Sequence, residues 1–145
     1  MAGLLRMERA GAWHQVTARG SERRAIFRDE RARARFCQWP GETARVFRWR
    51  WHACVLMDSH YHLLAETPEP NLGRAMQWLN ASYSVWFNRR HQRAGHLFQG
   101  RFKSIVVGAM AVSVAARRLA RRVSKEPELS RALNQGRQKL QMFYV

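Results

Sequence analysis

Two histidines stand one residue apart at His60 and His62, within a segment whose composition favours a β-strand. Alternate side chains of a strand face the same side, so both imidazoles point one way and Tyr61 points the other. Their backbones lie about 7 Å apart by the rise of a strand, and two imidazoles at that spacing can converge on one divalent ion. Neighbouring strand histidines are also typical of a solvated sheet face, so the spacing alone leaves both interpretations open.

The elements around the histidine pair predict a mixed fold of the α+β class. Residues 46–57 form an apolar run that favours a strand, in which Trp49 and Trp51 are predicted to pack against helices. Asp58 and Ser59 favour a tight turn before the return strand that holds the pair. The whole chain predicts strands over 12–19, 46–57, 60–66 and 101–107 and helices over 29–39 and 71–92.

In chain order these elements run β-α-β-β-α-β, the pattern of the ferredoxin-like split βαβ fold. That fold is an antiparallel sheet with helices packed on one face. Two further basic helices are predicted over 111–123 and 126–142. We therefore expect one domain over residues 1–107 and a basic helical C-terminal tail over residues 108–145.

The chain carries a large excess of positive charge. Of its 145 residues, 26 are Lys or Arg and 10 are Asp or Glu, for a formal net charge of +16. Residues 1–68 hold 12 basic and 7 acidic side chains, whereas residues 69–145 hold 14 and 3. A compact chain this basic usually has an anionic partner, and nucleic acid is the leading candidate, ahead of an anionic membrane or an acidic protein.

Several classes of protein are disfavoured. No apolar run approaches the roughly 20 residues that span a bilayer, and the start of the sequence lacks the apolar core of a secretory signal. Cys37 and Cys54 are too few for a disulfide framework. We therefore expect a cytoplasmic protein with no membrane partner.

Three groups of side chains are candidates for contact with nucleic acid. Arg19, Arg23 and Arg24 flank the first turn, where a solvated turn is the alternative interpretation. Arg89 and Arg90 end the long helix, where cations also complement the helix dipole. The third group comprises His96, Gln99, Arg101 and Lys103. Phe98 and Phe102 lie between these residues in the sequence, and such aromatic side chains predict stacking with unpaired bases.

The order of these motifs along the chain resembles a known family. The similar segments are GAWHQVTARGSERRAIF, HACVLMDSHYHLLAETPEPNLGRAMQWLNASYSVWFNRRH and GHLFQGRFKSIVV, the last ending at Val107. They resemble the REP-associated tyrosine transposases, which belong to the single-tyrosine HUH transposases of mobile elements. HUH denotes His, a hydrophobic residue and His, which here are His60, Tyr61 and His62. The resemblance covers about two thirds of the chain.

The resemblance implies a single-stranded DNA endonuclease and transferase. In that family the two histidines hold Mg²⁺ or Mn²⁺, which polarises the scissile phosphate. A tyrosine hydroxyl then attacks, forming a 5′-phosphotyrosine link and releasing a 3′-OH. The implied partners are hairpins formed by repetitive extragenic palindromes and a second copy of the chain in a homodimer. The implied location is the bacterial cytoplasm, associated with the nucleoid.

The sequence departs from the family at two places. Ser59 stands where the family usually has Asn, and both residue types cap turns. After Val107 the family has a helix that carries the nucleophile as Tyr, three residues, Asn and Pro, whereas this chain reads GAMAVSVAARRLARRVSKEPELSRAL. Of the remaining tyrosines, Tyr61 faces away from the metal and Tyr83 lies on an apolar helix stripe. Tyr144, near the end of the sequence, is a poor substitute nucleophile.

We therefore expect a transposase-family protein that binds single-stranded or hairpin DNA and is catalytically impaired. The family's third metal ligand is expected to be missing together with the tyrosine helix. An ion held only by His60 and His62 would bind weakly, because hard cations prefer about six oxygen-rich ligands. The alternatives are a non-catalytic RNA- or DNA-binding regulatory module and a decaying fragment of a transposase.

Overall fold

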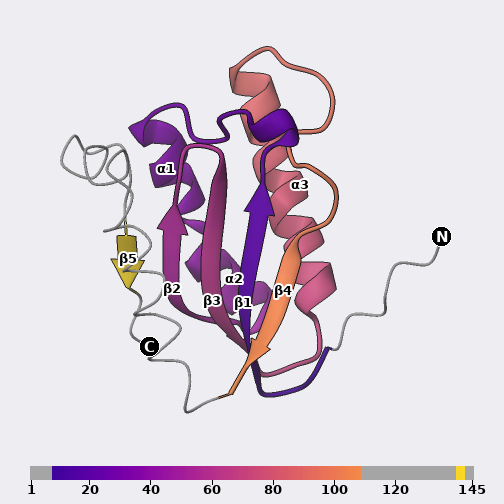
Figure 1. Cartoon of the computed structure of the whole chain (residues 1–145). Helices are drawn as coiled ribbons and strands as arrows, with labels where there is room; N and C mark the ends of the chain where they lie inside the picture. Colours follow the sequence, from indigo (N-terminus) through magenta and orange to yellow (C-terminus); the bar gives the residue numbers. More distant parts are fainter. Residues whose placement is uncertain (1–7, 109–139, 143–145) are drawn as a thin grey trace.

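The computed structural model describes residues 8–108 and 140–142. Five strands form one sheet in the order β4-β1-β3-β2-β5, in which every neighbouring pair is antiparallel, and the helices cover one face of it (Figure 1). The predicted α+β class and the ferredoxin-like order of the first four strands are confirmed. The elements are β1 (Ala12–Arg19), the 3₁₀ turn η1 (Ser21–Arg23), α1 (Glu30–Phe36), α2 (Trp39–Phe47), β2 (Arg50–Leu56), β3 (His60–Thr67), α3 (Leu72–Arg90), β4 (Lys103–Val107) and β5 (Leu140–Met142).

The structure has two helices, α1 and α2, where one helix was predicted over 29–39. Helix α1 already ends at Phe36, and Pro40 lies in the first turn of α2, where a missing N–H removes no bond within the helix. The helix runs on to Phe47. At Arg48 the backbone φ is 59°, a left-handed cap that turns the chain out of the helix. Strand β2 therefore begins at Arg50, later than predicted.

Aromatic side chains fill the layer between the sheet and the helices. The ring centroid of Phe36 on α1 lies 4.7 Å from that of Tyr61 on β3 and 5.6 Å from that of Tyr83 on α3. Trp49 and Trp51 are 1% and 2% exposed, so both pack in the core as predicted. The face of the sheet that carries Tyr61 is therefore the inner face, and large aromatic rings from α1, α2 and α3 cover it.

Two ion pairs fasten α1 to its surroundings. Asp29 caps α1 by accepting the N–H of Ala32 at 2.9 Å, and its two carboxylate oxygens accept bonds from Arg90 at 2.8 and 2.6 Å. Arg33, whose side chain is 3% exposed, donates from Nη2 to Oδ1 of Asp58 at 2.7 Å. Helix α1 thus joins the C-terminal end of α3 to the turn that precedes β3.

Strand β5 extends the sheet beyond β2. Leu140 lies opposite Val55 and Met142 lies opposite Ala53. The helix predicted over 126–142 is therefore wrong at these residues, because the edge of β2 supplies inter-strand hydrogen bonds that a local sequence pattern does not reveal. The helix predicted over 111–123 and the rest of the basic tail lie outside the described residues. Among the helices described, none is long and apolar enough to cross a membrane.

Candidate functional site

His60 and His62 lie on the face of the sheet turned away from the helices, which we call the histidine face. Between them Tyr61 points into the core, where its hydroxyl donates to Oδ1 of Asn80 at 2.5 Å. The centroids of the two imidazoles are 5.0 Å apart, and their planes meet at 85°. The side chain of His62 is 7% exposed, and that of His60 is half-buried. The strand therefore brings two imidazoles together at one partly sheltered place.

Two hydroxyl groups fix the orientation of these rings. Oγ1 of Thr17 lies 2.9 Å from Nδ1 of His62, and Oγ of Ser59 lies 3.2 Å from Nδ1 of His60. Thr17 is opposite His62 in the β1–β3 register, as Arg19 is opposite His60. Sequence reasoning did not single out Thr17, although the two-residue period of β1 places it on the same face as Arg19.

Carboxylates do not complete a metal-binding cluster beside this pair. Across residues 8–108 and 140–142, no group of three or more His, Cys, Asp or Glu is arranged to hold a metal ion. Glu66 lies on the histidine face but four residues beyond His62, about 13 Å along the strand, and it pairs with Arg50 at 3.7 Å. Asp58 is engaged by Arg33. Two imidazoles alone make a low-affinity site for Mg²⁺ or Mn²⁺.

The tyrosines of the described chain are turned away from the histidines. Tyr61 and Tyr83 are both fully buried on the helix side of the sheet. Burial raises the pKa of each phenol well above its usual range, which keeps both protonated. Tyr83 also donates its proton to the backbone carbonyl of Ile26. Neither hydroxyl is placed to attack a phosphate at the histidine pair, and Tyr144 lies outside the described residues.

Three segments meet at the end of the sheet where His60 lies. The N–H of Gly20 donates to the carbonyl of Ser59 at 2.7 Å, and the N–H of Gln99 donates to the carbonyl of Arg19 at 2.8 Å. Arg23 ends η1 and Arg24 follows it, and both are exposed. Arg24 pairs with Glu22 at 2.7 Å, with both side chains largely in solvent. The structure thus brings the first predicted basic group beside the histidine pair.

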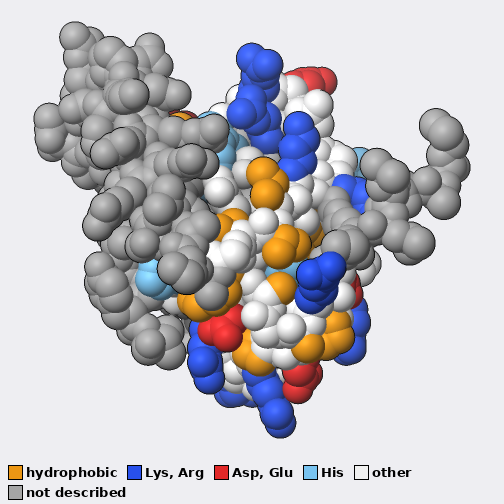
Figure 2. All heavy atoms as spheres, turned by 60° about the horizontal axis from the view of Figure 1, so that its bottom comes forward, with side chains coloured by type: hydrophobic (Ala, Val, Ile, Leu, Met, Phe, Trp, Pro, Cys, Tyr) orange, Lys and Arg blue, Asp and Glu red, His pale blue; other side chains and the backbone are white. Residues whose placement is uncertain are grey.

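The third predicted group divides between surface and core. His96, Gln99 and Arg101 are exposed in the segment before β4, and the exposed Lys103 lies opposite Thr17 on the histidine face. In the view of Figure 2, Lys and Arg side chains lie above, below and to the right of a middle region of hydrophobic and uncharged atoms, with a few Asp and Glu side chains among them.

The predicted stacking surface is not formed by the aromatic residues of this segment. The ring of Phe98 packs against Tyr61 and Tyr83 at centroid distances of 6.0 and 6.4 Å, and Phe102 is 9% exposed. Both rings are drawn inward because the segment closes over the edge of the core. The polar side chains of the segment, rather than its aromatic rings, are exposed to solvent.

Arg89 and Arg90 lie apart from the other candidates. They end α3, on the side of the sheet opposite the histidine face, and Arg90 is held by Asp29. Arg89 is exposed. The sequence suggested all three groups as contacts for nucleic acid. The fold places Arg89 and Arg90 on the helix side of the sheet, away from the other two groups.

Comparisons with known proteins agree on one kind of fold. The family model described as transposase IS200 like matches residues 11–118. A structure of a REP-associated tyrosine transposase bound to a REP hairpin is similar with a TM-score of 0.57 at 14% identity, over 74% of this chain and 63% of that one. A Deinococcus radiodurans R1 protein described as a transposase candidate gives a TM-score of 0.56 at 13% identity, over 83% of this chain and 97% of that one. A search of curated protein sequences found no significant match.

Proposed function

We propose, from the premise that this chain belongs to the IS200-like transposase family, that it binds single-stranded or hairpin DNA and cleaves it little or not at all. The observation that carries the proposal is the composition of the histidine face. His60 and His62 lie on β3, and Arg19 of the neighbouring strand β1 is opposite His60. Lys103 lies on the next strand, β4, opposite Thr17. This set offers imidazoles and cations to a phosphate but brings no described tyrosine hydroxyl.

The basic groups beside the histidine pair support binding through the DNA backbone. Arg19, Arg23 and Arg24 cluster at one end of the sheet, and guanidinium groups match the geometry of phosphate oxygens. Lys103 adds a cation on the same face as His62. Binding of this kind weakens steeply as salt concentration rises, because each neutralised phosphate releases counterions.

The histidine pair suits a weakly held divalent ion. His60 and His62 would hold Mg²⁺ or Mn²⁺, and the bound ion would polarise and orient a DNA phosphate. Thr17 and Ser59 would keep the rings oriented through Nδ1, so coordination would be through Nε2. The remaining ligands would be water and the oxygens of the phosphate itself.

The proposal is tested by separating binding from cleavage. A labelled palindromic single strand is titrated with the protein, and the same mixture with Mn²⁺ is run on a denaturing gel to detect a covalent adduct. We expect salt-sensitive binding and no adduct. We also expect Mn²⁺ to strengthen DNA binding by the original chain but not by the double variant His60→Ala with His62→Ala. An adduct that disappears in Tyr144→Phe would show an active nucleophile and overturn the proposed loss of cleavage.

Two further experiments test which nucleic acid the chain binds and whether it forms a dimer. Equal affinity for the DNA hairpin and for an unrelated RNA would favour a general nucleic-acid-binding module instead. We also propose that the chain forms a homodimer, which light scattering on the purified protein would show as twice the chain mass.

A further inference from the structure

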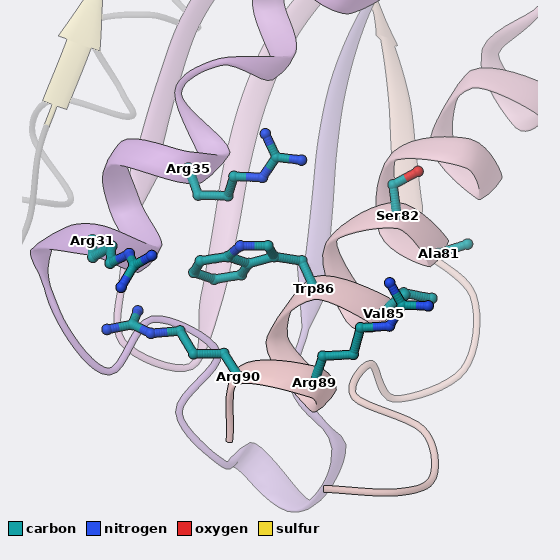
Figure 3. A pocket seen from close by; sticks show the side chains of 8 residues that line it. All are labelled: Arg31, Arg35, Ala81, Ser82, Val85, Trp86, Arg89 and Arg90. Atoms are coloured by element: carbon teal, nitrogen blue, oxygen red, sulfur yellow. The ribbon is translucent and has the colours of Figure 1, made fainter. Parts of the chain in front are cut away.

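A second basic surface lies on the helix side of the sheet, between α1 and α3. It is a pocket of about 710 Å³ whose lining includes four arginines and one tryptophan. Figure 3 shows Arg31 and Arg35 of α1 and Arg90 of α3 around the ring of Trp86, while Arg89 of α3 extends beside Val85. Because α1 and α3 cover the inner face, this pocket is separated from the histidine pair by the sheet.

Two of the four arginines are fixed by the protein. Arg90 is held by both carboxylate oxygens of Asp29, and its guanidinium lies 5.4 Å from the ring centroid of Trp86. Arg35 donates to Gln38 at 2.6 Å. These two guanidinium groups form an ordered part of the lining, but the carboxylate of Asp29 balances the charge of Arg90, so the unbalanced positive charge of the pocket comes from the other arginines.

The other two arginines are available. Arg31 and Arg89 are both exposed, and neither side chain makes a hydrogen bond or ion pair with any residue in the described part of the chain. No carboxylate is among the residues that line the pocket, while Ser82 adds a hydroxyl. A concave surface with unpaired guanidinium groups and no acidic side chain favours an anion with several oxygen acceptors.

We propose that this pocket, which we call the α1–α3 pocket, is a second contact for nucleic acid and binds backbone phosphates of a segment that does not reach the histidine pair. The proposal rests on the proposed DNA binding and adds a separate surface to it. DNA supplies the required ligand as a series of phosphates, so one strand can occupy both faces by passing around the edge of the sheet. The ring of Trp86 already lies under the guanidinium of Arg90, so we expect the pocket to contact phosphates rather than bases.

The test compares two double variants of equal charge change. Arg31→Gln with Arg89→Gln removes the two available cations, and Arg45→Gln with Arg48→Gln removes two exposed cations near the end of α2 as the control. The probe is a fluorescent DNA hairpin with a long single-stranded extension, and its affinity is measured over a range of salt concentrations. We expect the pocket variant to bind about tenfold more weakly at low salt and to lower the salt-dependence slope by about 2.

A third variant leaves the arginines in place. Ser82→Asp brings a carboxylate to the pocket lining and is expected to weaken binding of the same probe, while thermal melts of all variants stay close to that of the original chain. An excess of poly-glutamate is expected to compete poorly, whereas strong competition that depends on Arg31 and Arg89 would overturn nucleic acid as the ligand.

The outcomes separate this inference from the proposed function. If the pocket and control variants weaken binding equally, the α1–α3 pocket is overturned and the histidine face still binds DNA. If the original chain binds no DNA at all, the proposed function itself fails.

Discussion

Removal of Asp58 is expected to destabilise the fold more than removal of its partner Arg33. The side chain of Arg33 is 3% exposed, whereas that of Asp58 is 59% exposed. Nε of Arg33 is buried and has no hydrogen-bond partner within the described residues. Asp58→Ala therefore leaves a guanidinium in the protein interior without its carboxylate, while Arg33→Met leaves a carboxylate that water can solvate.

The magnitude follows from what remains around the guanidinium. Breaking a fully buried ion pair costs about 3–5 kcal/mol, but Glu30 stays 3.7 Å from Arg33, so we expect about 2 kcal/mol for Asp58→Ala. A chain of this size would lose about 7 °C in melting temperature. Arg33→Met keeps the packing volume and is expected to cost less than about 1 kcal/mol.

The assay is urea unfolding of both variants and of Asp58→Ala combined with Glu30→Gln, which removes the second carboxylate. The combined variant is expected to be less stable than Asp58→Ala alone by about 0.5–1 kcal/mol. If Arg33→Met is the more destabilising single change, packing of the arginine stem rather than its charge dominates, and the reasoning is refuted.

Three other changes test separate parts of the structure. Thr17→Val removes the hydroxyl beside His62 and is expected to weaken Mn²⁺ binding about tenfold in calorimetry with little effect on the melt; unchanged affinity would mean that the hydroxyl does not orient the ring. Burial lowers the pKa of His14 below 6.5, so the unfolded chain takes up a proton that the folded chain resists, and stability should fall as pH drops below about 6.5. His14→Gln should reduce this dependence in urea midpoints measured at several pH values, and the remainder is expected from His91, whose pKa is also lowered by burial; an unchanged slope in the variant would show that His14 does not contribute. Asn71→Ala removes the acceptor of a buried indole and the donor to a backbone carbonyl, so we expect a loss of about 2–4 kcal/mol by urea unfolding; a loss below about 1 kcal/mol would show that water replaces both bonds.

The sequence predicts the sheet better than the helices. Apolar and polar residues alternate in 12–19 and in the strand that follows Ser59, because alternate side chains of a strand face the core. The structure has strands at both places. Helix α2 was not predicted, because it contains Pro40, and a proline disrupts the interior of a helix but is tolerated in the first turn. Strand β5 depends on an edge supplied by β2, a partner far away in the chain.

The histidine pair was predictable because strand geometry is local. The two-residue period places His60 and His62 together and Tyr61 opposite without knowledge of any other element. The position of Lys103 one strand beyond Thr17 depends on the register between β1 and β4, which the sequence does not display. The inward rotation of Phe98 likewise depends on how the loop closes over the core.

The position of β1 between β3 and β4 has a consequence for the order of folding. Strands β2 and β3 are joined by a short turn and can pair early, whereas β1 must pair Ala12 with Thr67 and Trp13 with Val107. Contacts between such distant parts of the chain slow folding, because the loops between them must close first. The hairpin that carries the histidines is therefore expected to form before Thr17 and the cations of β1 and β4 are assembled around it. During synthesis, the proposed affinity for DNA should arise only after β4 has joined the sheet.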